Sequence, residues 1–135
     1  METAHVKYLG GLRTEATHLK SGNKLITDAP TDNHGKGEAF SPTDLMATSL
    51  ASCILTVMGI MADRKEIPFE AAEAKVTKIM GSNPRRIEEV VIEITIPDQN
   101  YTDEQKKLLE AAGRACPVGK SVHPDMKETI SFNYL

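Results

Sequence analysis

The sequence contains no tryptophan and few other aromatic residues, only three phenylalanines and three tyrosines in 135 residues. So few aromatic rings do not favour a surface on which nucleic-acid bases stack. Basic runs are also missing, because no stretch of lysine and arginine is longer than a pair, and 16 basic against 19 acidic residues give a formal charge of −3. We therefore expect no nucleic-acid partner.

Cysteine is scarce as well, with one residue at position 53 and one at position 116. The chain therefore has no disulfide scaffold, and at this length residues 1–135 are expected to form a single domain that buries its own core. The N-terminus lacks a basic stretch followed by an apolar one, so no secretory signal is predicted and a cytoplasmic location is expected. In a reducing compartment, two cysteines are more often free thiols or a reversible redox pair than a structural bridge.

The longest apolar run, residues 41–67, is predicted to form one long central helix. Ser41 is a good N-cap, Pro42 suits the first helical position, and Asp44 can complete a capping box. No charged side chain occurs between Leu45 and Ala62, and apolar residues fall on nearly every face, which predicts a helix buried all round. The run is near the lower length limit for crossing a bilayer, but its serines, threonines and missing basic flank do not favour a membrane span.

Ser49, Ser52 and Thr56 lie beside Cys53 or one helical turn from it, so the cysteine lies on a mildly polar stripe of this helix. Such a stripe could border a pocket. Alternatively, the hydroxyl groups bond to their own backbone and allow close packing of a neighbouring element. The sequence leaves both interpretations open.

The rest of the chain is typical of β-strands with one further helix. Gly10-Gly11 predicts a hairpin turn, and Thr102 with Gln105 forms a second capping box that opens a helix carrying Cys116 on its core side. The expected strands cover residues 5–9, 12–18, 24–28, 71–80, 85–97 and 128–134, with a loop over 29–40. This order predicts an α+β fold.

The four histidines give no metal-ligand spacing, and neither cysteine has a ligand three or four residues away, so no metal or cofactor is expected. His123, soon after Cys116, could line a pocket as an acid or hydrogen-bond donor, or could simply end the preceding helical turn.

Two motifs carry a family resemblance. The segment Ser41-Pro42-Thr43-Asp44-Leu45 leading into Ala51-Ser52-Cys53, with Ala115-Cys116-Pro117-Val118 far downstream, resembles the two cysteine motifs of the OsmC/Ohr superfamily, the osmotically inducible and organic hydroperoxide resistance proteins. The resemblance implies antiparallel sheets wrapped around the long central helix in an intertwined homodimer. It also implies that Cys53 is the peroxidatic cysteine, that Cys116 is the resolving one, and that an external dithiol such as a lipoylated protein reduces their disulfide.

A thiolate at Cys53 needs a nearby cation, because desolvation raises a thiol pKa and Cys53 is roughly three turns from the helix start. Relatives supply an arginine from the N-terminal hairpin, held by a glutamate near the start of the long helix. Arg13 is the matching candidate, although it is also consistent with an exposed strand arginine. Thr43 occupies the position of that glutamate, so Asp44 or Glu38 would have to replace it; this departure resembles a less characterised OsmC-like branch.

The leading hypothesis is a thiol-dependent peroxidase for oxidative-stress defence that reduces organic hydroperoxides or hydrogen peroxide. An apolar lining formed by Leu50, Ile54, Val57 and Met58 would favour organic peroxides. One alternative is a non-enzymatic dimer that binds a small apolar ligand. Another is a hot-dog-like thioesterase, which lacks an evident acid or base on the central helix beyond Asp44.

Overall fold

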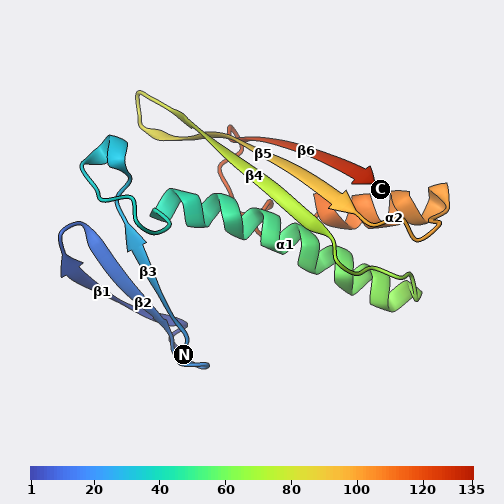
Figure 1. Ribbon diagram of the computed structural model, residues 1–135, viewed down its shortest axis with the longest axis horizontal. Helices are drawn as coiled ribbons and strands as arrows, with labels where there is room; N and C mark the ends of the chain where they lie inside the picture. Colours follow the sequence, from blue (N-terminus) through green and yellow to red (C-terminus); the bar gives the residue numbers. More distant parts are fainter. The chain divides into compact units, whose positions relative to one another are not determined.

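The computed structural model describes residues 1–135 and confirms the α+β class (Figure 1). The chain divides into two compact units, Met1–Met46 and Ala47–Leu135, and the boundary falls inside the long helix α1. A single domain over residues 1–135 and an intertwined homodimer stay predictions.

The first unit is an antiparallel sheet in the order β1-β2-β3 followed by a loop. Its strands are β1 (Ala4–Gly10), β2 (Arg13–His18) and β3 (Lys24–Asp28), and a short 3-10 helix, η1 (Thr31–Asn33), lies in the predicted loop. The predicted hairpin is confirmed, but its two-residue turn is Gly11-Leu12, because Gly10 ends β1 and pairs with Arg13. Gly10 and Gly11 have φ angles of 85° and 62°, which glycine adopts without steric cost, and Leu12 has a φ of 63°. Every residue of β1 is exposed, so this sheet has little apolar core of its own.

The second unit contains a mixed three-stranded sheet in the order β4-β5-β6. The strands β4 (Glu73–Gly81) and β5 (Arg86–Ile96) are antiparallel, whereas β6 (Lys127–Tyr134) runs parallel to β5. The expectation of antiparallel sheets is therefore wrong for this one pair. The helix α2 (Asp103–Arg114) separates β5 from β6, and such a crossover returns the chain to the same end of the sheet, so that the next strand is parallel.

The core of the second unit lies between this sheet and the two helices (Figure 1). Alternate residues of β5 point into it and have no solvent exposure, namely Val90, Ile92, Ile94 and Ile96. Leu109 of α2 is also fully buried. A Cβ built on Gly113 would lie 3.0 Å from Cγ2 of Ile54, so α2 packs closely against α1 at this glycine.

The helix α1 (Pro42–Lys65) buries one face, not every face, and the prediction of a helix buried all round is wrong for the single chain. Its buried residues recur at helical spacing: Ala47, Leu50, Ala51, Ile54, Met58 and Ala62. Other apolar side chains of the helix, among them Met46 and Ile60, are exposed. By length and apolar composition α1 could cross a membrane, but the core helices of soluble proteins meet the same criterion.

Both predicted capping boxes are confirmed. The Ser41 hydroxyl accepts a hydrogen bond from Asp44 N at 3.0 Å, and the Asp44 carboxylate accepts one from Ser41 N at 3.0 Å. Thr102 and Gln105 form the same reciprocal pair at the start of α2. These bonds satisfy backbone N–H groups that the first helical turn leaves unpaired, so both helix starts are set by local sequence.

Cys116 does not lie on a helix, which corrects the sequence prediction. The helix α2 ends at Arg114 with Ala115 as its C-cap, and Cys116 is in the turn that follows. Pro117 supplies the reason, because the residue before a proline is disfavoured in the helical conformation.

Candidate functional site

The two cysteines, distant in sequence, are neighbours in the second unit. Cys53 projects from α1 and is partly exposed, whereas Cys116 comes from the turn after α2 and has only 1% of its surface exposed. The Cys53 side chain lies close enough to act on Cys116, since it is among the causes that raise the pKa of that thiol. The fold thus brings together the two residues on which the redox hypothesis depends, although the spacing in sequence could not show it.

The surroundings of Cys116 keep its thiol protonated. Burial raises its pKa above the ordinary value, and the nearby Cys53 side chain and the charge of Glu128 act in the same direction. The backbone N–H of Gly119, 3.4 Å from Sγ, acts against them because it favours the thiolate. The net result is a neutral thiol near neutral pH, which is a weak nucleophile until a base removes its proton.

Arg13 lies in the first unit, where two carboxylates hold its guanidinium. The Asp28 carboxylate accepts hydrogen bonds from Nε at 2.7 Å and from Nη2 at 2.9 Å, and the Glu38 carboxylate accepts one from Nη2 at 3.0 Å. The bidentate bond to Arg13 lowers the pKa of Asp28, and both carboxylates raise the pKa of Arg13. Asp28, only 1% exposed, is therefore charged at neutral pH and fixes the direction of the arginine.

Asp28 is a residue that the sequence reasoning missed. It is the last residue of β3, and it is the direct partner of Arg13 in the antiparallel ladder between β2 and β3. Pairing the two predicted strands across the turn at residues 21–23 would have placed these opposite charges on the same face.

Glu38 and Asp44, the two candidates to replace a glutamate at Thr43, have different surroundings. Glu38 binds Arg13, and its backbone N–H donates to Asp28 Oδ2 at 3.1 Å. Asp44 caps α1. Both line a shallow cavity of about 360 Å³ with Gly37, Ala39 and Phe40.

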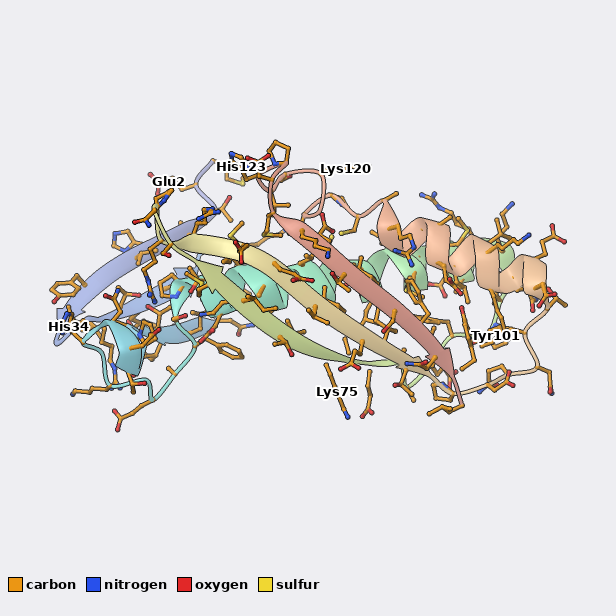
Figure 2. The ribbon with its side chains drawn as sticks, turned by 90° about the horizontal axis from the view of Figure 1, so that it is seen from above. Glu2, His34, Lys75, Tyr101, Lys120 and His123 are labelled. Carbon is orange, nitrogen blue, oxygen red and sulfur yellow. The ribbon has the colours of Figure 1, made fainter.

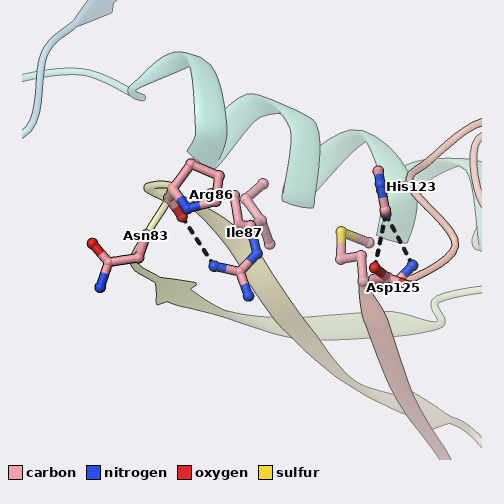
Figure 3. Close-up of a pocket in the computed structure, with 7 residues that line it drawn as sticks. Asn83, Arg86, Ile87, His123 and Asp125 are labelled. Carbon is pink, nitrogen blue, oxygen red and sulfur yellow. Dashed lines mark hydrogen bonds and ion pairs between the residues drawn. The ribbon is translucent and has the colours of Figure 1, made fainter.

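His123 lines a different cavity from the one expected. This cavity of about 480 Å³ lies in the second unit and is formed by the turn between β4 and β5, including Asn83 and Arg86, and by the loop before β6 (Figure 3). Nδ1 of His123 accepts a hydrogen bond from Asp125 N at 3.0 Å, and the side chain is 72% exposed. Figure 2 shows His123 and Lys120 on this loop. Neither cysteine lines the cavity.

The apolar lining expected from the central helix is also absent from both cavities. Leu50, Ile54 and Met58 are fully buried in the core, and Val57 packs against it. One element of the polar stripe is explained by backbone bonding, because the Thr56 hydroxyl donates to Ser52 O at 2.8 Å. No group of three histidine, cysteine, aspartate or glutamate side chains is arranged to hold a metal ion.

The candidate residues thus form two groups. Cys53 and Cys116 meet in the second unit, while Arg13, Glu38 and the additional Asp28 meet in the first. A paired thiol site with one accessible and one buried sulfur is suited to a cycle between dithiol and disulfide.

Comparison with known proteins shows the family to which the chain belongs. A family model described as OsmC-like protein matches residues 35–131, and the chain therefore belongs to the OsmC-like family. An uncharacterized protein from Acinetobacter baylyi is 33% identical over 119 residues, which cover 85% of this chain and 81% of that one.

Solved structures extend the comparison. A protein from Psychrobacter arcticus, thought to be induced by osmotic stress and to act in detoxification, is 52% identical, with a TM-score of 0.93 over 98% of this chain and 96% of that one. An organic hydroperoxide resistance protein from Legionella pneumophila has a TM-score of 0.73 with 18% identity over 98% of each chain, and at this identity it shows the fold alone. The OsmC-like fold expected from the sequence is confirmed.

Proposed function

We propose that this protein is a thiol-dependent peroxidase that reduces organic hydroperoxides, with Cys53 as the peroxidatic and Cys116 as the resolving cysteine. The observation that carries the proposal is the proximity of these two free thiols, which is close enough for Cys53 to contribute to the raised pKa of Cys116. Membership of the OsmC-like family supports it, as do structural neighbours named organic hydroperoxide resistance proteins.

The reaction takes two steps on the protein. The Cys53 thiolate attacks the terminal oxygen of the hydroperoxide, the O–O bond breaks, and the alkoxide takes a proton and leaves as an alcohol, so sulfur is oxidised by two electrons to a sulfenic acid. The Cys116 thiol then attacks that sulfur, and water leaves as the disulfide forms. An external dithiol restores both thiols and becomes a disulfide itself. We propose a lipoylated protein or a small dithiol in this role.

The difference in exposure between the two sulfurs supports the division of roles. Cys53 is partly exposed, so a peroxide can reach it from solvent, whereas Cys116 is 1% exposed. The raised pKa of Cys116 also makes it the poorer first nucleophile. A buried partner that waits for the sulfenic acid protects Cys53 from further oxidation.

Arg13 is proposed to favour the thiolate of Cys53 and to bind the peroxide. Its Nε and Nη2 atoms are used by Asp28 and Glu38, while Nη1 donates no hydrogen bond within the chain. Two N–H groups of a guanidinium fixed in direction are therefore available to an anion. In this proposal Asp28 and Glu38 fix the guanidinium of Arg13, which the uncharged side chain of Thr43 cannot do by a charged bidentate contact.

We further propose that the protein acts as a homodimer in the cytoplasm. The exposed apolar residues support an oligomer, since they occur on both units, including Val6, Tyr8 and Leu25 of the first sheet and Ile60 of α1. Light scattering after size-exclusion chromatography measures the state, and a monomer at micromolar concentration would contradict the dimer.

Thiol counting tests the peroxidase proposal. The reduced protein is mixed with a slight excess of cumene hydroperoxide, and free thiols are titrated after quenching. We expect the loss of two thiols per chain in the wild type, none in Cys53→Ser, and only one in Cys116→Ser, where a sulfenic acid remains on Cys53. Stopped-flow oxidation with cumene hydroperoxide and with hydrogen peroxide then compares the rates for the two substrates. Because neither cavity has the expected apolar lining, the support for a preference for organic peroxides comes from the structural neighbours that are named organic hydroperoxide resistance proteins.

The alternatives give different results in the same assay. Unchanged thiols in the wild type would contradict the peroxidase and favour a passive ligand-binding dimer. Unchanged thiols together with cleavage of an acyl thioester would favour the thioesterase. An Arg13→Lys variant that reacts as fast as the wild type would remove Arg13 from the mechanism, because lysine cannot keep the bidentate bond to Asp28.

A further inference from the structure

One charged residue of β6 points toward the core. The strand alternates between an inward, half-buried set, Glu128, Ile130, Phe132 and Tyr134, and an outward, exposed set, Lys127, Thr129, Ser131 and Asn133. In the ladder with β5, Glu128 is the partner of Val90, which has no solvent exposure. A glutamate therefore occupies a position where the pattern of the strand predicts an apolar residue.

This carboxylate lies beside the thiol of Cys116. Glu128 Oε1 and Cys116 Sγ flank one side of Gly119, at 3.1 and 3.4 Å from the point where a Cβ on that glycine would stand. A larger residue at position 119 would thus meet both groups. Burial is the main cause of the raised pKa of Cys116, and the charge of Glu128 acts in the same direction.

Glu128 forms no ion pair and accepts no hydrogen bond. The side chain is half-buried, and its carboxylate oxygens keep contact with water, because no buried side-chain oxygen of the chain lacks a hydrogen-bond partner. A carboxylate without a competing partner is available to accept a proton from a neighbouring group.

Other charged groups near this site do not neutralise it. Lys78 of β4 lies in the same row of the sheet, with Val90 between it and Glu128. Arg114 of α2 donates to Ile130 O at 3.4 Å and lies over the ring of Phe132. Lys120 and His123 of the loop before β6 are exposed. The titratable group that lies near Glu128 is therefore the thiol of Cys116.

We propose that Glu128 is the proton acceptor for Cys116 when this thiol attacks the sulfenic acid on Cys53. The carboxylate takes the thiol proton as the S–S bond forms and the S–O bond breaks, and the departing hydroxide receives that proton and leaves as water. Atoms and electrons balance without another reactant. The inference rests on the proposed peroxidase function and adds a residue to its second step.

The negative charge of Glu128 has a second effect that makes the inference testable. It disfavours the free thiolate of Cys116, so if that charge were its only contribution, removing it would speed disulfide formation. If Glu128 accepts the proton in the transition state, its removal slows the step near neutral pH. The two contributions thus predict opposite changes in the rate of disulfide formation when the charge of Glu128 is removed.

The experiment follows both chemical steps by rapid quenching and intact mass after oxidation with cumene hydroperoxide. The sulfenic acid adds one oxygen to the chain, and the disulfide then removes two hydrogens relative to the reduced protein. Wild type is compared with Glu128→Gln, with Glu128→Asp, and with Glu93→Gln, a matched change on the exposed face of β5. Each protein is measured from neutral to alkaline pH.

We expect Glu128→Gln to form the sulfenic acid at the wild-type rate but the disulfide about 100-fold more slowly near neutral pH. At alkaline pH, where hydroxide removes the thiol proton, it should equal or exceed the wild type. Glu128→Asp should recover part of the rate, and Glu93→Gln should not differ from wild type.

A Glu128→Gln variant that closes the disulfide as fast as the wild type near neutral pH, or faster, overturns the inference and leaves the peroxidase intact. Loss of the first step in both Glu128→Gln and Glu128→Asp also overturns it, because the residue would then act on Cys53 or on folding. A wild type that never loses thiols overturns the peroxidase itself, and the role of Glu128 with it.

Discussion

Closing the Cys53–Cys116 disulfide should stabilise the second unit measurably. The bridge would enclose a loop of about 60 residues, and the chain-entropy relation for cross-links gives about 4 kcal/mol of stabilisation for a loop of that size. Because the two thiols are neighbours in the folded chain, we expect little backbone movement when the bond forms. We therefore expect most of this gain to appear in the free energy of unfolding.

Urea denaturation of the reduced and the peroxide-oxidised protein at equal concentration measures the gain. With a slope of about 2 kcal/mol per molar urea, 4 kcal/mol corresponds to a midpoint raised by about 2 M. Cys116→Ser, treated with the same peroxide, is the control and should keep its midpoint, since no bridge can form. Equal concentration matters because an oligomer gains stability with concentration.

An oxidised wild type with an unchanged or lower midpoint would refute the reasoning. It would mean that bridging distorts the turn after α2 or the end of the core around Cys116. The proximity of the two thiols would then be no guide to the geometry of the disulfide.

Three further changes test the fold. Gly113→Val should destabilise the protein by about 3 kcal/mol, measured by urea denaturation, because its side chain meets Ile54 and Met58, which lie 3.0 and 3.2 Å from a Cβ there; Gly113→Ala should cost less, since alanine favours the helix. The pKa of Asp28 is lowered in the folded protein, so this residue stabilises the fold above the ordinary aspartate pKa of about 3.9. That stabilisation is lost as the pH falls through the lower pKa of the folded state. In acid denaturation, Asp28→Asn should not show this loss. Thr102→Ala should cost about 1 kcal/mol of unfolding free energy, and an unchanged midpoint would show that the capping box contributes nothing.

What the sequence predicted well are features that depend on residues a few positions apart. The capping boxes at Ser41 and Thr102 and the glycine hairpin around Gly11 each depend on a single turn of chain. The alternation of β5 is likewise visible along the strand itself. Such signals survive in the folded protein because no distant contact is needed to satisfy them.

Only the tertiary structure decided the groups that chemistry requires. The ladder between β2 and β3 placed Asp28 opposite Arg13, and the turn after α2, ended by Pro117, brought Cys116 to Cys53. The parallel return of β6 set Glu128 beside that thiol. These placements depend on strand register and on which face of each element is buried, and a shift of one residue in a strand would reverse every one of its side chains. The residue types are thus visible in the sequence, but the distances between their side chains are set by packing between elements far apart along the chain.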